Sequence, residues 1–251
     1  MKGKKNKVVA VIPARFASIR FPGKPLVILG NKPLIQHVYD SAAQTDLFDK
    51  IIVATDDKRI FDEVADFGGE IVLTSKHHKS GTDRIAEVCK NLEAEIIVNI
   101  QGDEPFISKE PLQKLISAFE DPIVQVASLM HKFMEEIENP NIVKVVCDKN
   151  NFALYFSRSP IPFIRTPHPA TRSSYPEFFK HIGIYAFRRE ALFRFIQLPM
   201  GKLEQTEKLE QLRFLENGIK IKMVETSYRG IGIDTPEDLK KAELILQRSK
   251  S

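Results

Sequence analysis

The stretch VVAVI at residues 8–12 runs directly into PARFASIRFPGKP at residues 13–25. Consecutive β-branched and other apolar residues predict a strand buried on both faces, as in a parallel sheet. The second part contains three cations, Arg15, Arg20 and Lys24, among prolines that forbid a regular helix. Because open α/β sheets bind ligands at the carboxyl ends of their strands, this loop predicts a site for a polyanion such as a triphosphate.

An ordinary solvated loop with surface cations is the alternative for this segment. Neither of the glycine-rich phosphate motifs, G-x-x-x-x-G-K-[ST] and G-x-G-x-x-G, follows the strand. Phosphate binding here would therefore depend on side-chain charge as well as on backbone amides.

The composition is that of a globular protein. The chain has 251 residues, of which 43% are hydrophobic, and a net charge of +4. This length is sufficient for a substantial core. The 33 acidic residues are mixed among 37 basic ones, whereas nucleic-acid binders concentrate cations on one face. The balance favours small anionic ligands and argues against a nucleic-acid partner.

The compartment is indicated by cysteines and apolar runs. Cys89 and Cys147 cannot form a disulfide framework and fit a reducing compartment. The apolar run behind the basic first residues ends after five residues, shorter than an export signal requires. No other apolar stretch approaches the ~20 residues that span a bilayer. We therefore expect a soluble, cytoplasmic protein without a membrane partner.

Strands and helices alternate through the first 130 residues. The expected strands are 8–12, 50–55, 70–74, 95–101 and 124–130, and the expected helices are 33–44, a helix capped by Asp56-Asp57, 84–92 and 111–119. This alternation predicts βαβ units and a largely parallel sheet, and so a Rossmann-like, nucleotide-binding half.

The second half has a different pattern. It predicts a hairpin of strands 141–148 and 152–157, strands 181–187 and 219–224, and helices around Ala191–Ile196, over 203–215 and from Thr235 onwards. No Gly- or Ser-rich linker separates the halves. We expect a single α/β domain over 1–251, with 1–130 as the nucleotide-binding half and about 141–215 as a smaller α/β lobe.

Asp103 is the first candidate metal ligand. It follows the predicted strand 95–101 and so lies on the same carboxyl edge of the sheet as the cationic loop. A carboxylate there can hold a hard cation such as Mg²⁺ against phosphate oxygens. A plain turn made by Gly102-Asp103 is the alternative, because that pair is frequent in turns.

Asp234 is the second candidate metal ligand. A helix-cap role is the alternative, but Thr235 can serve as the cap, with Pro236 in the first turn and Asp238 as its partner. Asp234 is then available for another role. Two carboxylates that converge on one Mg²⁺ would form a nucleotidyl-transfer site, in which positioning and charge neutralisation supply most of the catalysis.

The segment 79–84 precedes a predicted helix. Backbone amides at a helix start favour an anion or a polar base edge. The alternative is a simple cap by Ser80 or Thr82. The adjacent His77 and His78 have no further ligands at a suitable spacing, so we do not expect them to bind a metal.

Five polar residues of the second half stand on segments that otherwise predict burial. His181 and Tyr185 share one face of a strand by its period of two. Glu210 and Gln211 lie on a predicted helix, and Arg158 follows a strand. Together they could bind an acidic, polyhydroxylated ligand, with arginine on a carboxylate. Satisfied polar groups in the core are the alternative.

These motifs occur in the order of a known family. The matching segments are R-x-x-S-x-R-x-P-G-K-P at 15–25, 79–84, QGDEP at 101–105, YFSR at 155–158, HIGIY at 181–185, LEQLR at 209–213 and GIDTPED at 232–238. The chain closely resembles the 3-deoxy-D-manno-octulosonate (Kdo) cytidylyltransferases. The resemblance covers nearly the whole chain but excludes residues 1–6 and the loop 165–178, whose arginines therefore gain no assigned role.

The resemblance implies a nucleotidyltransferase fold and a reaction of CTP with Kdo that gives CMP-Kdo and pyrophosphate for lipopolysaccharide biosynthesis. Arg15 and Lys24, assisted by Arg20, would hold the triphosphate. Asp103 and Asp234 would hold Mg²⁺, the implied cofactor, and Arg15, Lys24 and the two aspartates are thus the implied catalytic residues.

The resemblance also implies the remaining contacts. The nucleotide would further touch Ala14, Ser80, Gly81, Thr82, Arg84 and Gln101. The pocket for the sugar acid would be lined by Arg158, His181, Tyr185, Glu210 and Gln211. A homodimer built through the smaller lobe is implied as well. A cytidylyltransferase for 8-amino-Kdo or a sialate-type acid is the alternative, although the segment 181–185 argues against a nine-carbon acid.

Overall fold

The computed structural model describes residues 7–17, 21–78, 80–165 and 177–248. Its strands are β1 (Val8–Ala14), β2 (Ile28–Leu29), β3 (Lys32–Pro33), β4 (Lys50–Thr55), β5 (Ile71–Leu73), β6 (Ile96–Asn99), β7 (Val126–Phe133), β8 (Lys144–Cys147), β9 (Ala153–Ser157), β10 (Phe178–Arg188) and β11 (Ile221–Glu225). Its α-helices are α1 (Leu34–Ala43), α2 (Lys58–Asp66), α3 (Gly81–Cys89), α4 (Lys109–Ser117), α5 (Arg189–Phe195), α6 (Lys202–Glu207), α7 (Leu212–Glu216) and α8 (Pro236–Arg248), with 3-10 turns η1 (Lys24–Leu26) and η2 (Ala118–Glu120).

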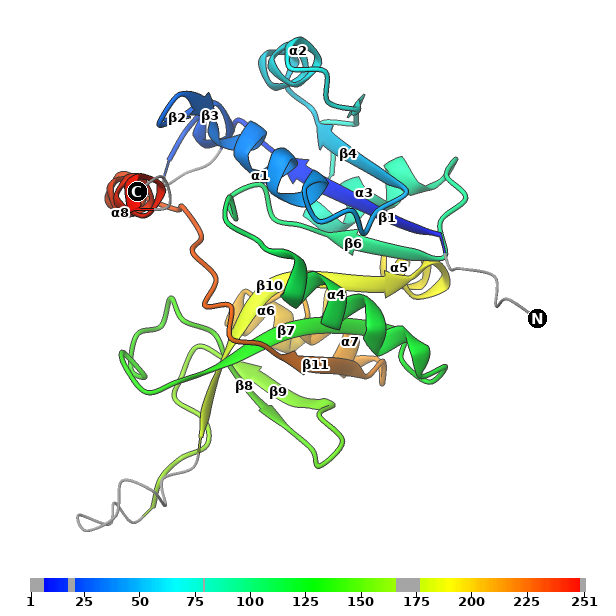
Figure 1. Cartoon of the computed structure of the whole chain (residues 1–251). Helices are drawn as coiled ribbons and strands as arrows, with labels where there is room; N and C mark the ends of the chain where they lie inside the picture. Colours follow the sequence, from blue (N-terminus) through cyan, green and yellow to red (C-terminus); the bar gives the residue numbers. More distant parts are fainter. Residues whose placement is uncertain (1–6, 18–20, 79, 166–176, 249–251) are drawn as a thin grey trace.

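A mixed sheet runs through the molecule in the order β11-β7-β10-β6-β1-β4-β5 (Figure 1). Along this path β10 is antiparallel to both of its neighbours, and the other pairs are parallel. The hairpin β8-β9 is attached through β8 to the far end of β10. The predicted α/β fold with a mostly parallel mixed sheet is confirmed.

The central strand β1 has a covered surface on each side. Val9 and Val11 pack into the core beneath α3 and α5, while Ala10 and Ile12 pack into the core beneath α1 and α4. All four are at most 1% exposed. Burial on both faces is the reason the strand consists of apolar residues at consecutive positions. Full burial of each large aliphatic side chain contributes about 2 kcal/mol.

The terminal helix returns to the first half of the chain. From β11 the chain crosses to α8, which packs beside β2 (Figure 1). Ile233 and Ala242 form a small apolar core there with Leu29 and Leu34. This return brings the segment around Asp234 to the carboxyl edge of the sheet. Within the described residues, no helix is both long and apolar enough to cross a bilayer.

The order of the strands was not predicted from the sequence. The alternation within 1–130 predicted a largely parallel sheet without a position in it for the strand 181–187. In the structure β10 lies between β6 and β7 and pairs with both. The pairing partner comes from much later in the sequence, so local periodicity carries no signal for it.

One correction concerns the helix expected over 203–215. The chain forms α6 and α7 instead, and Lys208 between them has a left-handed φ of 55°. The carboxylate of Glu207 accepts hydrogen bonds from Ser157 Oγ and the Arg158 amide, at 2.7 and 3.0 Å. These tertiary bonds accompany the break and outweigh the weak local helix propensity.

The boundaries of several elements also differ from the prediction, and two of these elements border the site. Strand β1 continues through Pro13, because its pairing with β6 ends at Val11 and Pro13 then borders only β4. A proline without an amide proton is tolerated at such an edge position. Helix α3 begins at Gly81 instead of Arg84, because Ser80 supplies its N-terminal cap.

Candidate active site

The cationic loop leaves β1 and closes on itself before η1. The Gly23 amide donates to the carbonyl of Phe16 at 2.9 Å. Gly23 has φ +71°, and a Cβ on it would lie 3.1 Å from the Phe16 ring, so glycine is needed at this turn. The turn places Lys24 at the start of η1, where its ammonium faces the end of β6. Arg20 lies outside the described residues.

Lys24 joins the two candidate carboxylates. Its Nζ lies 2.6 Å from Asp103 Oδ2 and 2.9 Å from Asp234 Oδ1. Burial by itself would lower the pKa of the ammonium, but the two carboxylates outweigh that effect and raise its pKa above the ordinary value. The expected convergence of Asp103 and Asp234 at this edge is therefore present, around a cation that the chain itself supplies.

Close backbone packing places Asp103 at this position. A Cβ on Gly102 would lie 2.9 Å from the carbonyl oxygen of Pro13, so only glycine lets the loop after β6 approach the end of β1 this closely. The carbonyl of Asp103 also accepts a hydrogen bond from the Ile233 amide at 3.0 Å. The two aspartate-bearing segments are thus tied to each other through the backbone.

Asp234 directly precedes the residue that caps α8, and its amide donates to the Asp238 carboxylate at 3.2 Å. Thr235 caps α8: its hydroxyl accepts from the Asp238 amide at 3.2 Å, and the Asp238 carboxylate accepts from the Thr235 amide at 3.0 Å. The predicted cap is confirmed, so Asp234 is not needed as the capping residue. Earlier in the same segment, the Tyr228 hydroxyl donates to Glu104 Oε2 at 2.6 Å.

Glu104 and Tyr228 were not recognised in the sequence. Burial raises the pKa of the Glu104 carboxyl to about 7, although the Tyr228 hydrogen bond acts in the opposite direction. Burial likewise raises the pKa of Tyr228, followed in size by the effect of the Glu104 charge. Glu104 was visible beside Asp103 in the QGDEP segment, whereas the isolated Tyr228 gave no pattern.

A cavity of about 300 Å³ opens beside these groups. Its lining residues are Pro13, Ala14, Arg15, Ala17, Lys24, Pro25, Gly81, Gln101, Gly102 and Asp103. They include five of the residues assigned to the nucleotide by resemblance: Ala14, Arg15, Lys24, Gly81 and Gln101. The Gln101 amide donates to the carbonyl of Gly183 at 3.1 Å, which links this cavity to β10.

The start of α3 is held by bonds within the protein. Ser80 and Asp83 form a capping box, and the Thr82 hydroxyl donates to Glu210 Oε2 at 2.8 Å. The fully buried Arg84 pairs with Asp56 at 2.7 Å and also donates to a threonine hydroxyl. The structure therefore shows internal partners for Ser80, Thr82 and Arg84, while Gly81 lines the cavity.

His181 and Tyr185 lie together on β10, as expected from their spacing. Their ring centroids are 5.3 Å apart, and both side chains are partly exposed. Burial lowers the pKa of His181 to about 3 and raises the pKa of Tyr185 well above its usual range. Both rings therefore remain uncharged near neutral pH.

Glu210 and Gln211 lie in the turn between α6 and α7. Burial raises the pKa of the Glu210 carboxyl, with the Ser80 and Thr82 hydroxyls acting in the opposite direction. Its second oxygen, Oε1, is buried without a hydrogen-bond partner in the described part of the chain. An unpaired buried acceptor is costly unless a ligand group supplies the donor. Gln211 is 6% exposed.

Arg158 has a different environment. Its Nε donates to the Glu207 carbonyl at 2.8 Å and its Nη1 to the Pro140 carbonyl at 2.9 Å. The guanidinium thus holds the base of the β8-β9 hairpin in this structure. The neighbouring loop 165–178, which lacked a family pattern, lies largely outside the described residues.

No histidine metal centre is present among the described residues, where no three His, Cys, Asp or Glu side chains converge as metal ligands. His78 instead contacts the carboxylate of Glu87. Asp103 and Asp234 supply two carboxylates. That number of protein ligands is typical of a Mg²⁺ site in which substrate phosphates and water supply the other oxygens.

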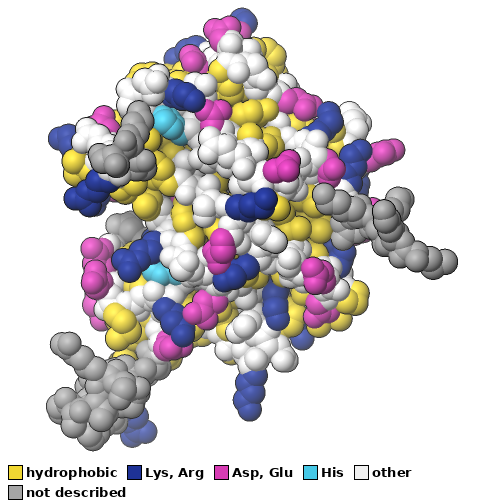
Figure 2. All heavy atoms as spheres, in the orientation of Figure 1, with side chains coloured by type: hydrophobic (Ala, Val, Ile, Leu, Met, Phe, Trp, Pro, Cys, Tyr) yellow, Lys and Arg dark blue, Asp and Glu magenta, His cyan; other side chains and the backbone are white. Residues whose placement is uncertain are grey.

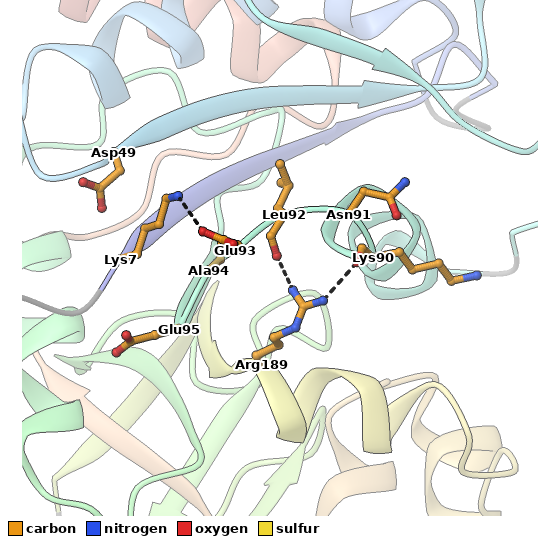
Figure 3. Close-up of a pocket in the computed structure, with 9 residues that line it drawn as sticks. All are labelled: Lys7, Asp49, Lys90, Asn91, Leu92, Glu93, Ala94, Glu95 and Arg189. Carbon is orange, nitrogen blue, oxygen red and sulfur yellow. Dashed lines mark hydrogen bonds and ion pairs between the residues drawn. The ribbon is translucent and has the colours of Figure 1, made fainter.

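A larger cavity, of about 830 Å³, lies at the opposite edge of the sheet (Figure 3). It is bordered by Lys7 and Asp49, which precede β1 and β4, and by Arg189 at the start of α5. Arg189 points to the end of α3 and donates to the carbonyls of Lys90 and Leu92 at 3.0 and 2.6 Å. Its guanidinium is therefore used to terminate a helix.

Comparison with known proteins gives consistent matches. The cytidylyltransferase family model matches residues 9–221. The chain is 52% identical over 246 residues to a 3-deoxy-manno-octulosonate cytidylyltransferase of Flavobacterium johnsoniae, covering 96% of this chain and 99% of the relative. It is 51% identical over 248 residues to the enzyme of the same name from Thermodesulfovibrio yellowstonii, covering 95% and 97%.

Solved structures agree with the sequence matches. A CMP:2-keto-3-deoxy-manno-octonic acid synthetase complexed with CTP superimposes with a TM-score of 0.91 at 44% identity, covering 97% of this chain and 99% of that one. A 4-diphosphocytidyl-2C-methyl-D-erythritol synthase from Anaerococcus prevotii has a TM-score of 0.65 at 20% identity, covering 97% and 99%, which shows the shared fold alone. The chain belongs to the cytidylyltransferase family, among the 3-deoxy-manno-octulosonate cytidylyltransferases.

Proposed function

We propose that this protein transfers CMP from CTP to the anomeric hydroxyl of Kdo and releases pyrophosphate. The observation that carries the proposal is the convergence of Asp103, Asp234 and Lys24 beside the cavity at the carboxyl edge of β1 and β6. This is the position at which open α/β sheets bind ligands. The membership of the chain in the family, at about half identity over nearly its full length, supports the same reaction.

On the nucleotide side, Arg15 and Lys24 neutralise the triphosphate, and Gln101 and Gly81 border the base and sugar. Two cations close to the reacting phosphate stabilise the charge that develops on the leaving pyrophosphate. Arg20 is proposed to assist, from the part of the loop outside the described residues. Ser80, Thr82 and Arg84 support the cavity wall through their internal hydrogen bonds.

Magnesium is proposed as the cofactor, held by Asp103 and Asp234. The fit rests on these carboxylates, which lie 2.6 and 2.9 Å from one cationic atom, Lys24 Nζ, and therefore can share a single hard cation. When bound, Mg²⁺ would neutralise phosphate charge and lower the pKa of a coordinated hydroxyl. The protein's own part is to hold the two carboxylates together, through Gly102 and the bond between Ile233 and Asp103.

On the acceptor side, His181, Tyr185, Glu210 and Gln211 are proposed to bind the hydroxyls of the sugar acid. The unpaired Glu210 Oε1 supports this role because a sugar hydroxyl would supply its missing donor. Arg158 is proposed to bind the carboxylate, which would require its guanidinium to exchange two carbonyl partners for the ligand.

The wider setting is also proposed. CMP-Kdo would enter lipopolysaccharide biosynthesis in the cytoplasm, and the two free cysteines, Cys89 and Cys147, suit a reducing compartment. A homodimer through the smaller lobe is supported by exposed apolar side chains there, with Leu154 at 62% and Phe163 at 87% exposed. Size-exclusion chromatography with light scattering tests the dimer, and a monomeric mass at micromolar concentration would reject it.

A basic nucleic-acid-binding module is the alternative from another class. On the face shown in Figure 2, Lys and Arg side chains alternate with Asp and Glu and do not gather into one basic patch. Two carboxylates facing the ligand would also repel a phosphate backbone. Both observations favour the enzyme.

Pyrophosphate release tests the proposal directly. The purified protein is given CTP with Kdo, 8-amino-Kdo or N-acetylneuraminic acid, each with Mg²⁺ or with excess EDTA. We expect rapid release only with CTP, Kdo and Mg²⁺ together. Faster release with either of the other acids would reassign the acceptor, and undiminished release in EDTA would remove magnesium from the proposal.

A further inference from the structure

Ser128 is a buried polar residue in β7 that has no place in the site described above. It is 0% exposed, and its strand neighbours Ala127 and Leu129 are equally buried. Its Oγ lies 2.9 Å from His181 Nε2, 3.2 Å from the Ile182 carbonyl and 2.9 Å from the Ile184 carbonyl. One hydroxyl therefore meets three polar atoms of β10.

The reason for this clustering is an irregularity in β10. Ile182 pairs with Leu129, but the next pair in the register is Tyr185 with Ser128, so two residues of β10 are left over between them. Such a bulge removes carbonyls from the regular ladder. Ser128 contacts two of these carbonyls, those of Ile182 and Ile184. The third, that of Gly183, accepts a hydrogen bond from the Gln101 amide at 3.1 Å. The bulge thus lies between His181 and the nucleotide cavity.

The proton on the serine oxygen determines the state of the histidine. A serine hydroxyl has one proton, and a carbonyl oxygen can only accept. If Ser128 donated its proton to His181 Nε2, no proton would lie between Oγ and either the Ile182 carbonyl oxygen, at 3.2 Å, or the Ile184 carbonyl oxygen, at 2.9 Å. Ser128 must therefore donate to a carbonyl of the bulge, and Nε2 must carry the proton that it donates to Ser128 Oγ.

The second ring nitrogen of His181 is then an acceptor. The lowered pKa, about 3 because of burial, keeps the ring neutral, so Nδ1 retains its lone pair. The Nε2 edge is closed by the fully buried Ser128, while the side chain as a whole is partly exposed. Nδ1 forms no hydrogen bond within the described part of the chain. The ring itself is fixed by Phe156 and Tyr185, whose centroids lie 5.1 and 5.3 Å away.

We propose that Ser128 is a positioning residue that locks His181 in the Nε2–H tautomer, so that Nδ1 accepts a hydrogen bond from a hydroxyl of the acceptor sugar. This inference rests on the proposed function for the identity of that sugar. The tautomer itself does not depend on it. Ser128 acts only through His181 and through the bulge that carries it, and it touches no substrate.

The tautomer is measured first, on the full-length protein without substrate. Two-bond ¹H–¹⁵N correlation spectra of ¹⁵N-histidine-labelled protein distinguish the two neutral tautomers, and His181→Gln assigns the signal. We expect His181 in the wild type to carry its proton on Nε2. A proton on Nδ1 would overturn the proposal, whatever the enzyme's substrate.

Kinetics of two variants then test the role. In Ser128→Ala we expect loss of the single tautomer and a KM for Kdo raised about fivefold, the effect of one neutral hydrogen bond, with the KM for CTP within about twofold of the wild type. Ser128→Thr keeps the hydroxyl and should restore both the spectrum and the KM. The control Thr45→Val also removes a buried hydroxyl that donates to a carbonyl, at the end of α1, and should change neither.

The outcomes separate the two proposals. If Ser128→Ala keeps the Nε2–H tautomer and the wild-type KM for Kdo, the positioning role is wrong. If Ser128→Ala does not fold, the wild-type spectrum and Ser128→Thr still decide: a wild-type Nδ1–H proton, or a changed tautomer in Ser128→Thr, rejects the role. If no activity with CTP and Kdo is found, the proposed function fails while the tautomer measurement stands.

Discussion

The two edges of the central sheet both carry charged side chains but use them differently. At the amino edge, the cavity of about 830 Å³ is bordered by Lys7, Asp49 and Arg189. Each of these has a local partner: Lys7 lies 3.8 Å from an exposed glutamate, Asp49 accepts the Val8 amide at 2.7 Å, and Arg189 binds helix-end carbonyls. At the carboxyl edge, the cavity of about 300 Å³ is smaller, and the charges there converge on one point.

The difference shows that convergence, and not volume, distinguishes the candidate active site. At the carboxyl edge, Asp103 and Asp234 both contact the Lys24 ammonium, so the two carboxylates lie close to one point. At the amino edge, Asp49 and Arg189 complete the hydrogen bonding of a strand start and a helix end, and Lys7 forms only an exposed ion pair. The charges at the amino edge therefore contribute to stability, whereas the converging charges at the carboxyl edge contribute to chemistry.

The largest expected effect comes from the shared carboxylates. Asp103→Asn and Asp234→Asn should each lower kcat about 10²–10³-fold, because each removes charge from the proposed metal site. Asp49→Asn is the matched control at the amino edge and should retain kcat. Pyrophosphate release at saturating CTP and Kdo gives the values, with circular dichroism to confirm folding. Near-normal turnover in either site variant would remove that residue from the metal site.

The amino edge should respond in stability instead. Arg189→Ala leaves carbonyls at the end of α3 without their donor and should lower the free energy of unfolding by about 1–3 kcal/mol. Lys7→Ala breaks only an exposed ion pair and should cost less than about 0.5 kcal/mol. Urea unfolding measures both. A higher KM for CTP in Arg189→Ala would indicate that the amino edge also binds ligand.

The third prediction concerns competition at the carboxyl edge. Lys24 and Mg²⁺ would compete for Asp103 and Asp234, so Lys24→Met should bind Mg²⁺ on the order of tenfold more tightly in the absence of CTP, although its turnover should fall. Isothermal titration calorimetry measures the affinity. Lys32→Met removes an ion pair of similar length, 2.7 Å to Asp40, away from the site, and serves as the control. Equal affinity in wild type and Lys24→Met would mean that the ion binds elsewhere.

The smallest expected effect is a pH dependence of stability. The pKa of His181 is lowered from 6.5 to about 3, so the unfolded chain takes up this proton near pH 6.5 while the folded chain does not. The stabilisation that neutral His181 gives to the folded state is therefore complete above pH 6.5 and is lost progressively as the pH falls toward 3. Urea midpoints at pH 7.5 and 5.5 should differ less in His181→Gln than in the wild type or the exposed-site control His77→Gln. An unchanged difference would contradict the burial of His181 as the cause.

Several parts of the fold and site follow from local sequence. Consecutive apolar residues in β1 predicted a strand covered on both faces, and the structure confirms it. The cap of α8 by Thr235 could be predicted because capping depends on residues only three positions apart. The carboxyl-edge position of Asp103 followed from the end of its strand. All three depend on short-range periodicity or hydrogen bonding, which the sequence displays directly.

Other parts depend on partners that are distant in the chain. The insertion of β10 between β6 and β7, the break at Lys208 and the meeting of Ser128 with His181 left no local pattern. Each results from many weak contacts between segments brought together only by the completed fold, and these contacts outweigh local propensity. The sequence by itself thus determined the fold class, the cationic loop and the two aspartates; only the tertiary structure decided that Lys24 joins those aspartates and which hydroxyl fixes the histidine of the acceptor site.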